Sequence, residues 1–119
     1  MYDKTNIFAK IIRGEIPAKK VYEDDNVLAF HDISPACPVH ILVIPKGEYE
    51  SFDDFAAQAS ADDIAYFFKT VQQIANQQNL QHEGYRILSN HGSNAGQTVP
   101  HFHLHILAGK KIAGLVPTE

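Results

Sequence analysis

The sequence predicts one α+β domain over residues 1–119, with a largely antiparallel sheet of about five strands, one long helix and one short helix. Three observations predict this fold. The 119 residues are 45% hydrophobic and 20% charged, which suits a single domain with its own core. Only one segment has the length and periodicity of a long helix. The other apolar segments are short, are joined by hairpin-scale connections, and lack the regular βαβ alternation of a parallel sheet.

The N-terminal elements are a short helix and a hairpin. Thr5 is expected to cap a helix from about Asn6 to Arg13. Two strands follow, Val21 to Glu23 and Val27 to His31. The Asp-Asn-rich residues 24–26 between them are typical of a hairpin turn.

A loop and a buried strand come next. Pro35 and Pro38 fit neither a helix nor a central strand, so the segment that holds them is a loop. Val39 to Ile44 is rich in β-branched residues and ends at Pro45, which predicts a well-buried strand.

The long helix has both a start signal and an apolar face. Ser60 with Asp63 resembles a capping box, and Asn79 is a reasonable stop. The spacing of the apolar residues predicts one buried stripe, made of Ile64, Phe67, Phe68, Val71, Ile74 and Ala75.

The last two strands are Tyr85 to Ser89 and His101 to Leu107, on either side of the loop His91 to Pro100. The final strand alternates with period two. Its three imidazoles therefore share one face, and we expect its apolar face to pack under the long helix. The apolar set is Phe102, Leu104 and Ile106.

Composition excludes several classes of function. Fourteen acidic against ten basic residues argue against binding to nucleic acid or to an anionic membrane, which both need surplus positive charge. No apolar run is long enough to span a bilayer, and the N-terminus lacks the basic start of a signal peptide. Cys37 stands alone, so no intrachain disulfide or CxxC site is expected, and a reducing cytoplasm is the expected location.

Three imidazoles on one strand face indicate either of two chemistries. Histidines two residues apart can share a zinc ion, and a water would complete a catalytic site. All three in a straight strand converge awkwardly on one ion, however. The alternative is phosphoryl or nucleotidyl transfer, because a neutral imidazole attacks phosphorus well and later leaves it. The flanking imidazoles would then set the tautomer and handle protons near neutral pH.

The loop before this strand favours the second chemistry. Residues 90–98 hold two glycines and several amides and hydroxyls but no acid. Such a loop can turn backbone N–H groups toward an anion, and the side chains of Gln97 and Thr98 can add donors. We therefore expect a phosphate site here rather than a metal site.

At these residues the chain resembles a known family. His101 to Leu107 has the alternating His-apolar pattern of the histidine triad (HIT) superfamily. Three upstream segments resemble its Hint branch, the histidine-triad nucleotide-binding proteins: Ile7 to Pro17, Phe30 to Pro35 and His40 to Lys46. The resemblance runs from about residue 5 to about residue 110 and implies a HIT-like fold.

The resemblance also implies roles for single residues. His103 would be the nucleophile that attacks an α-phosphate, and His101 and His105 would flank it as orienting and proton-handling groups. His40 would support the triad from a neighbouring strand. Asp32 would accept hydrogen bonds from the ribose hydroxyls, which suits a carboxylate.

The remaining nucleotide contacts follow the same resemblance. The phosphate- and sugar-contacting positions are Asn90, Gly96, Gln97 and Thr98, and the purine slot is lined by Ile7, Phe8, Ile11, Phe30 and Ile33. His31 and His82 match no such position and are expected at the surface. The residues 114–119 lack the aromatic-proline ending of eukaryotic relatives, so the leaving group of the substrate stays open.

The activity implied is hydrolysis of a purine nucleotide derivative, with adenosine 5′-phosphoramidate as the expected substrate. No cofactor or metal is required, since loop amides and imidazoles can offset the phosphate charge. The resemblance also implies a homodimer. Two alternatives remain: a dinucleoside polyphosphate hydrolase that uses the same histidines, and a nucleotide-binding regulatory module whose activity is incidental.

Overall fold

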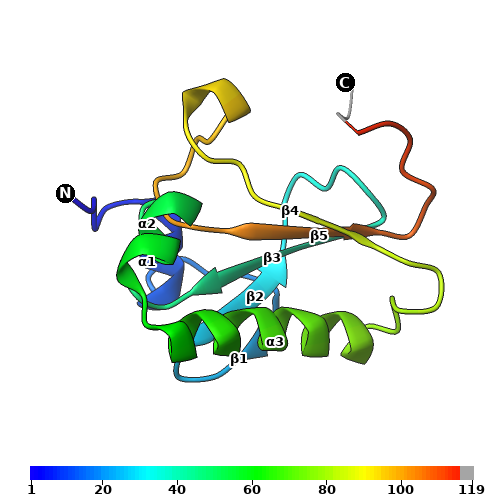
Figure 1. Cartoon of the computed structure of the whole chain (residues 1–119), viewed down its shortest axis with the longest axis horizontal. Coiled ribbons are helices and arrows are strands. Elements are labelled where there is room, and N and C mark those ends of the chain that lie inside the picture. The colour runs from blue at the N-terminus through cyan, green and yellow to red at the C-terminus, as the bar shows by residue number, and fades with distance from the viewer. Residues whose placement is uncertain (116–119) are drawn as a thin grey trace.

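The computed structural model describes residues 1–115, which form an α+β fold around one five-stranded sheet. The strand order is β1-β2-β3-β5-β4, and every neighbouring pair is antiparallel, which confirms the predicted fold class. The predicted domain end, and with it most of the segment 114–119, lies outside the described residues. The elements (Figure 1) are α1 (Ile7–Ile12), β1 (Lys20–Glu23), β2 (Val27–His31), β3 (Val39–Pro45), α2 (Phe52–Gln58), α3 (Ala61–Gln77), β4 (Arg86–Leu88), the 3-10 turn η1 (Ser93–Ala95) and β5 (Leu104–Ala108).

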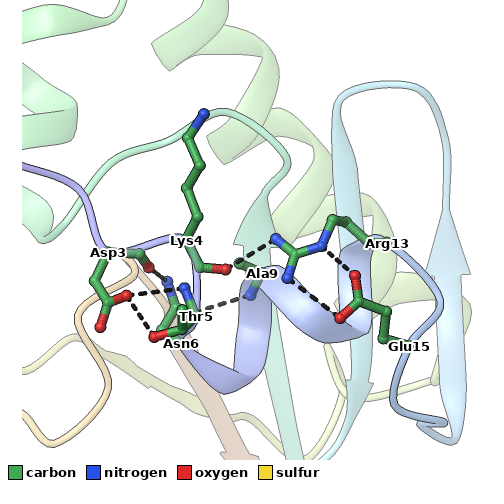
Figure 2. Close-up of polar contacts among 7 residues, drawn as sticks. All are labelled: Asp3, Lys4, Thr5, Asn6, Ala9, Arg13 and Glu15. Atoms are coloured by element: carbon green, nitrogen blue, oxygen red, sulfur yellow. Dashed lines mark hydrogen bonds and ion pairs between the residues drawn. The ribbon is translucent and has the colours of Figure 1, made fainter.

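Helix α1 is capped by Asn6, so the predicted cap at Thr5 is wrong by one residue. The side-chain oxygen of Asn6 accepts a hydrogen bond from the Ala9 N–H at 2.9 Å. Thr5 instead donates its N–H and its hydroxyl to the Asp3 carboxylate, as Figure 2 shows. Threonine and asparagine are both good N-cap residues. Here the Thr5 hydroxyl is engaged by Asp3, and the cap position falls to Asn6.

A second short helix, α2, was not predicted. The Ser51 hydroxyl caps it by accepting from the Asp54 N–H at 3.3 Å, and Asp53 and Asp54 lie in its first turn, where the helix dipole favours negative charge. Its one fully buried side chain is Phe55. A helix of seven residues with one buried side chain carries almost no apolar periodicity, which is why the sequence pattern misses it.

Helix α3 begins as predicted, because the Ser60 hydroxyl accepts from the Asp63 N–H at 3.0 Å. Asn79 ends the segment in the left-handed region, with φ of 60°. The buried stripe is correct except at its margin: Phe68 is 36% exposed, and Thr70 is buried instead. Phe68 lines an open hollow together with Ile87 and Leu88 of β4. In the part of the chain that the structure describes, no helix is long and apolar enough to cross a membrane.

Two apolar layers cover the two faces of the sheet. On one face α2 and α3 pack against the sheet, and Phe102, Leu104 and Ile106 belong to this layer, as predicted. On the other face α1 packs against the sheet through Phe8 and Ile11. The residues of the sheet that complete this second layer are Leu28, Phe30, Leu42 and Ile44. The histidines open onto the α1 side.

The strand that was predicted from His101 begins only at Leu104, and the one predicted from Tyr85 to Ser89 is shorter. The Phe102 N–H donates to the carbonyl of Tyr49 at 2.8 Å, so the chain before β5 pairs with the segment that leads into α2 and not with β3. As a result, His101 and His103 precede the strand and only His105 lies within it.

Candidate active site

His103 presents one free ring nitrogen to a cleft. Its Nδ1 lies 2.7 Å from the main-chain carbonyl of His101, so Nδ1 carries the proton and donates it to that oxygen. The lone pair is therefore on Nε2. Burial lowers the pKa of His103, which keeps the imidazole neutral at neutral pH. The ring of Phe8 stands edge-on at a centroid distance of 4.9 Å and fixes the imidazole plane. This is the arrangement that a nucleophilic imidazole needs.

His101 lies behind His103 and is fully buried. Its Nε2 donates to the carbonyl of Pro45 at 2.8 Å, and its Nδ1 accepts from the Tyr2 hydroxyl at 2.5 Å. Burial lowers the pKa of His101 to about 4. Both ring nitrogens are thus engaged within the protein. Of the two roles expected for His101, these contacts fit orientation of His103 and leave no nitrogen for a phosphate.

His40 and His105 form a directed hydrogen-bond chain. They lie on β3 and β5, which pair in the register Leu42↔His105 and His40↔Leu107. The Ala36 N–H donates to His40 Nδ1 at 2.9 Å, so the proton of a neutral His40 is on Nε2. That proton is donated to His105 Nδ1 at 2.9 Å, with an oxygen of Asp32 at 3.4 Å.

The series of hydrogen bonds from Ala36 through His40 to His105 ends at a donor without a partner in residues 1–115, His105 Nε2. Because His105 Nδ1 accepts, its proton is on Nε2, a buried atom with no hydrogen-bond partner among the described residues. Burial, with His103 and His40 nearby, lowers the pKa of His105 to about 4. A buried N–H without a partner is costly, and an oxygen of a bound ligand would satisfy it.

Part of this chain of side chains also brings together three candidate metal ligands. Asp32, His40 and His105 each bring one ligand atom within 4.8 Å of the others, a spacing that a divalent cation tolerates. A metal on His40 Nε2 would require that nitrogen to lose its proton. The proton would then sit on Nδ1 and face the Ala36 N–H, donor against donor. The arrangement therefore favours a hydrogen-bonded chain over a metal centre.

A cleft of about 320 Å³ opens in front of His103 and His105. It gathers most of the predicted nucleotide-binding residues: Ile7, Phe8, Ile11, Phe30, Asp32, Ile33 and Thr98. Ile33 lies at its mouth and is 94% exposed. An apolar slot with a carboxylate and two imidazoles at one end suits a ring system that carries a polar tail.

Some lining residues were not predicted. They are Ile16, Pro17, Ala18, His31, Leu42 and Val99. Leu42 had a signal in the sequence, because it is two residues from His40 on one strand and therefore shares its face. His31 is exposed, as expected, but lies at the rim of the cleft.

Three of the predicted phosphate and sugar contacts do not line this cleft: Asn90, Gly96 and Gln97. The Gln97 side chain braces the loop, since it donates to the carbonyls of Glu50 and Val99 and accepts from the Gly92 N–H. The N–H groups of residues 95–97 bond to carbonyls within the loop. The loop N–H groups that were expected to bind a phosphate therefore bond within the loop instead. Of the four predicted phosphate- and sugar-contacting residues, Thr98 lines the cleft.

The lowered pKa values predict acid sensitivity of the fold. Between about pH 4 and pH 6.5, His101 and His105 bind protons in the unfolded chain but not in the folded one. The free energy of unfolding should therefore fall as the pH falls through this window. Urea unfolding at several pH values measures it, and H105Q should weaken the dependence whereas H82Q, at an exposed site, should not. A free energy of unfolding that stays constant across the window would contradict the assignment of buried neutral histidines.

Comparisons with known proteins agree with this geometry. The HIT domain family model matches residues 13–112. A HIT-like protein of Rickettsia prowazekii is 52% identical over 116 residues, which cover 98% of this chain and 97% of that protein. A histidine triad protein from Clostridium difficile has a solved structure that is 44% identical, with a TM-score of 0.88, over 98% of this chain and 100% of that one. The structure of a HIT family hydrolase from Legionella pneumophila is 39% identical, with a TM-score of 0.83, over 92% of this chain and 96% of that one.

Proposed function

The chain belongs to the HIT domain family, and on this premise we propose that it hydrolyses purine nucleotide derivatives, with adenosine 5′-phosphoramidates as its substrates. The observation that carries the proposal is the pair of ring nitrogens at the end of the cleft. His103 offers a lone pair on Nε2, and His105 offers an unpartnered N–H. A nucleophile beside a buried donor is what displacement at a phosphate requires.

The nucleotide would lie along the cleft. Its purine occupies the apolar end between Ile11, Phe30 and Ile33. The ribose hydroxyls donate to Asp32, whose other contacts are the Ser34 N–H at 2.7 Å and His40. The α-phosphate then reaches His103 and His105. This order places the uncharged ring in the apolar slot and the charge beside the unpartnered N–H of His105.

The reaction proceeds in two displacements. His103 Nε2 attacks the α-phosphorus, a phosphorus–nitrogen bond to His103 forms, and the bond to the leaving amine breaks. The amine takes a proton from solvent as it leaves. The His105 N–H donates to a phosphate oxygen while charge develops on it, and His103 keeps its Nδ1 proton, which it donates to the carbonyl of His101. Water then attacks the phosphorus, the bond to His103 breaks, and AMP and a proton leave.

A substrate panel tests the proposal. We expect kcat/KM for adenosine 5′-phosphoramidate to exceed that for diadenosine polyphosphate, and to be unchanged by a chelator. The opposite preference would support the dinucleoside polyphosphate hydrolase. A protein that binds AMP but releases amine no faster than its H103A variant would be a nucleotide-binding regulatory module.

We also propose that two copies pair through the β4 edge, which ends the strand order of the sheet. Ile87 at this edge is 46% exposed, and it lines an apolar hollow with Phe52, Phe68 and Leu104. An exposed apolar edge strand is a ready template for pairing, and a two-fold contact would cover both the strand and the hollow. Tyr66 on α3 is also exposed, but it is not part of this proposed interface. Its hydroxyl donates to Asp24 beside the β1–β2 turn, at the other end of the strand order.

The dimer predicts a clear result from light scattering. The wild-type mass should be near twice the 13.3 kDa of one chain at low micromolar concentration. I87D should split the dimer or prevent folding, because it would bury an unpaired charge at the seam. The exposed variant K69D, on the opposite side of α3 from its buried stripe, is the control for added charge. A wild-type monomer, or a folded I87D dimer, would contradict this interface.

A further inference from the structure

A tyrosine at the start of the chain reaches the catalytic histidines. The Tyr2 hydroxyl lies 2.5 Å from His101 Nδ1, and the two rings meet edge to face at a centroid distance of 5.6 Å. Tyr2 lies outside residues 13–112, the part of the chain that the family model matches. The histidine that it contacts is fully buried.

The direction of this hydrogen bond is fixed by its neighbours. The carbonyl of Pro45 can only accept, so the proton of neutral His101 must be on Nε2. Nδ1 is then an acceptor and the Tyr2 hydroxyl is the donor. Burial raises the pKa of Tyr2, so the hydroxyl keeps the proton that it donates. Both ring nitrogens of His101 are satisfied only while Tyr2 is in place.

The contact of Tyr2 with His101 continues to His103, the proposed nucleophile. The main-chain carbonyl of His101 accepts the Nδ1 proton of His103 at 2.7 Å, and that bond decides which nitrogen of His103 is free to attack. A rotation of the His101 ring would shift the main chain of His101, and with it the carbonyl that accepts from His103 Nδ1. Tyr2 therefore touches the nucleophile through one intermediate residue.

The segment that follows Tyr2 is held in place by several hydrogen bonds. The Asp3 carboxylate accepts from the N–H and the hydroxyl of Thr5, and its carbonyl accepts from the Asn6 side chain at 2.7 Å. Arg13, from the end of α1, donates to the carbonyl of Lys4 at 2.9 Å. Figure 2 shows how these bonds tie the turn after Tyr2 to α1. Chain termini are mobile unless anchored, and this one is anchored next to Tyr2.

We propose that Tyr2 is a positioning residue for the nucleophile: its hydroxyl holds the ring of His101 in place, and the carbonyl of His101 holds His103 with Nε2 free. This role rests on the proposed function. It adds to the site a residue that never touches the substrate. The Tyr2 hydroxyl, His101 Nε2 and His103 Nδ1 each keep their proton throughout the reaction, so the role of Tyr2 is orientation and not proton transfer.

Y2F tests this role, because it keeps the aromatic ring and removes only the hydroxyl. We expect kcat to fall by about three- to tenfold, the effect of one lost hydrogen bond, while KM and AMP affinity stay unchanged. Isotope-edited NMR of the histidine nitrogens should show a shifted and broadened His101 Nδ1 signal, because Nδ1 loses its donor while the Nε2 proton stays bonded to the carbonyl of Pro45. D3A, which loosens the turn without touching either ring, should change kcat and the His101 signals in the same direction. Y85F, at a partly exposed tyrosine beside β4, is the matched control.

The outcomes separate the two proposals. His101 signals and kcat in Y2F that equal those of the wild type would overturn the role of Tyr2. Equal falls in kcat for Y2F and Y85F would overturn it as well. A wild-type protein that releases no amine from phosphoramidates would overturn the proposed function instead, whatever the NMR spectra of Y2F show.

Discussion

Replacing His103 with alanine is expected to lower kcat by on the order of 10³-fold or more, because the covalent route is lost with the nucleophile. The side chain offers the free Nε2 of the site, and His105 beside it offers a donor and not a lone pair. AMP binding should survive, since the apolar slot and Asp32 are untouched. Steady-state kinetics and calorimetric titration with AMP measure the two effects.

The control for His103 is His82, which lies exposed outside the site. H82A should keep wild-type kcat and AMP affinity. An H103A enzyme within about tenfold of wild type would contradict a covalent mechanism, because loss of such a nucleophile costs far more. Loss of AMP binding together with turnover would show that the variant has disturbed the cleft itself.

Replacing His105 with phenylalanine is expected to lower kcat by about 10²- to 10³-fold, the usual cost of removing a preorganised donor to a developing oxyanion. Phenylalanine keeps the ring in place and removes both nitrogens. It also strips His40 Nε2 of its acceptor, which lies at 2.9 Å in the wild type. Stability should be measured beside kcat, so that a folding defect is seen separately.

The matched variant is H105Q. A glutamine can accept from His40 and still present an N–H toward the cleft. It should therefore retain more activity than H105F, at equal or lower stability. Equal kcat for the two variants, or an H105F enzyme that turns over like the wild type, would contradict the assignment of His105 as the donor.

The sequence predicts the fold well where a single element carries its own signal. Helix α3 has a capping serine and regular apolar spacing from Ile64 to Ala75, and its start at Ser60 is confirmed. Helix α2 has one buried side chain and was missed. Phe68 follows the apolar spacing but is 36% exposed, because it lines an open hollow between α3 and β4, and helix periodicity alone does not show what covers a residue.

The site is predictable to the extent that it follows strand alternation and the family resemblance. His40 and His105 are diagonal neighbours on one face of the sheet, because their strands pair with Leu42 opposite His105. His101 differs, since its orientation depends on the carbonyl of Pro45 and on Tyr2, which are 56 and 99 residues away in the sequence. Gln97 differs for a related reason. Its amide meets the carbonyl of Glu50, a contact that only the folded chain creates.

The stereochemistry at phosphorus tests the central claim, a nucleotidylated His103, most directly. An adenosine 5′-phosphoramidate made chiral by one sulfur at the α-phosphorus is hydrolysed in water enriched in heavy oxygen, and the configuration of the product is determined. Each in-line displacement inverts the phosphorus. Two displacements through His103 predict net retention of configuration, whereas net inversion would mean that water attacks the substrate directly and would contradict the account.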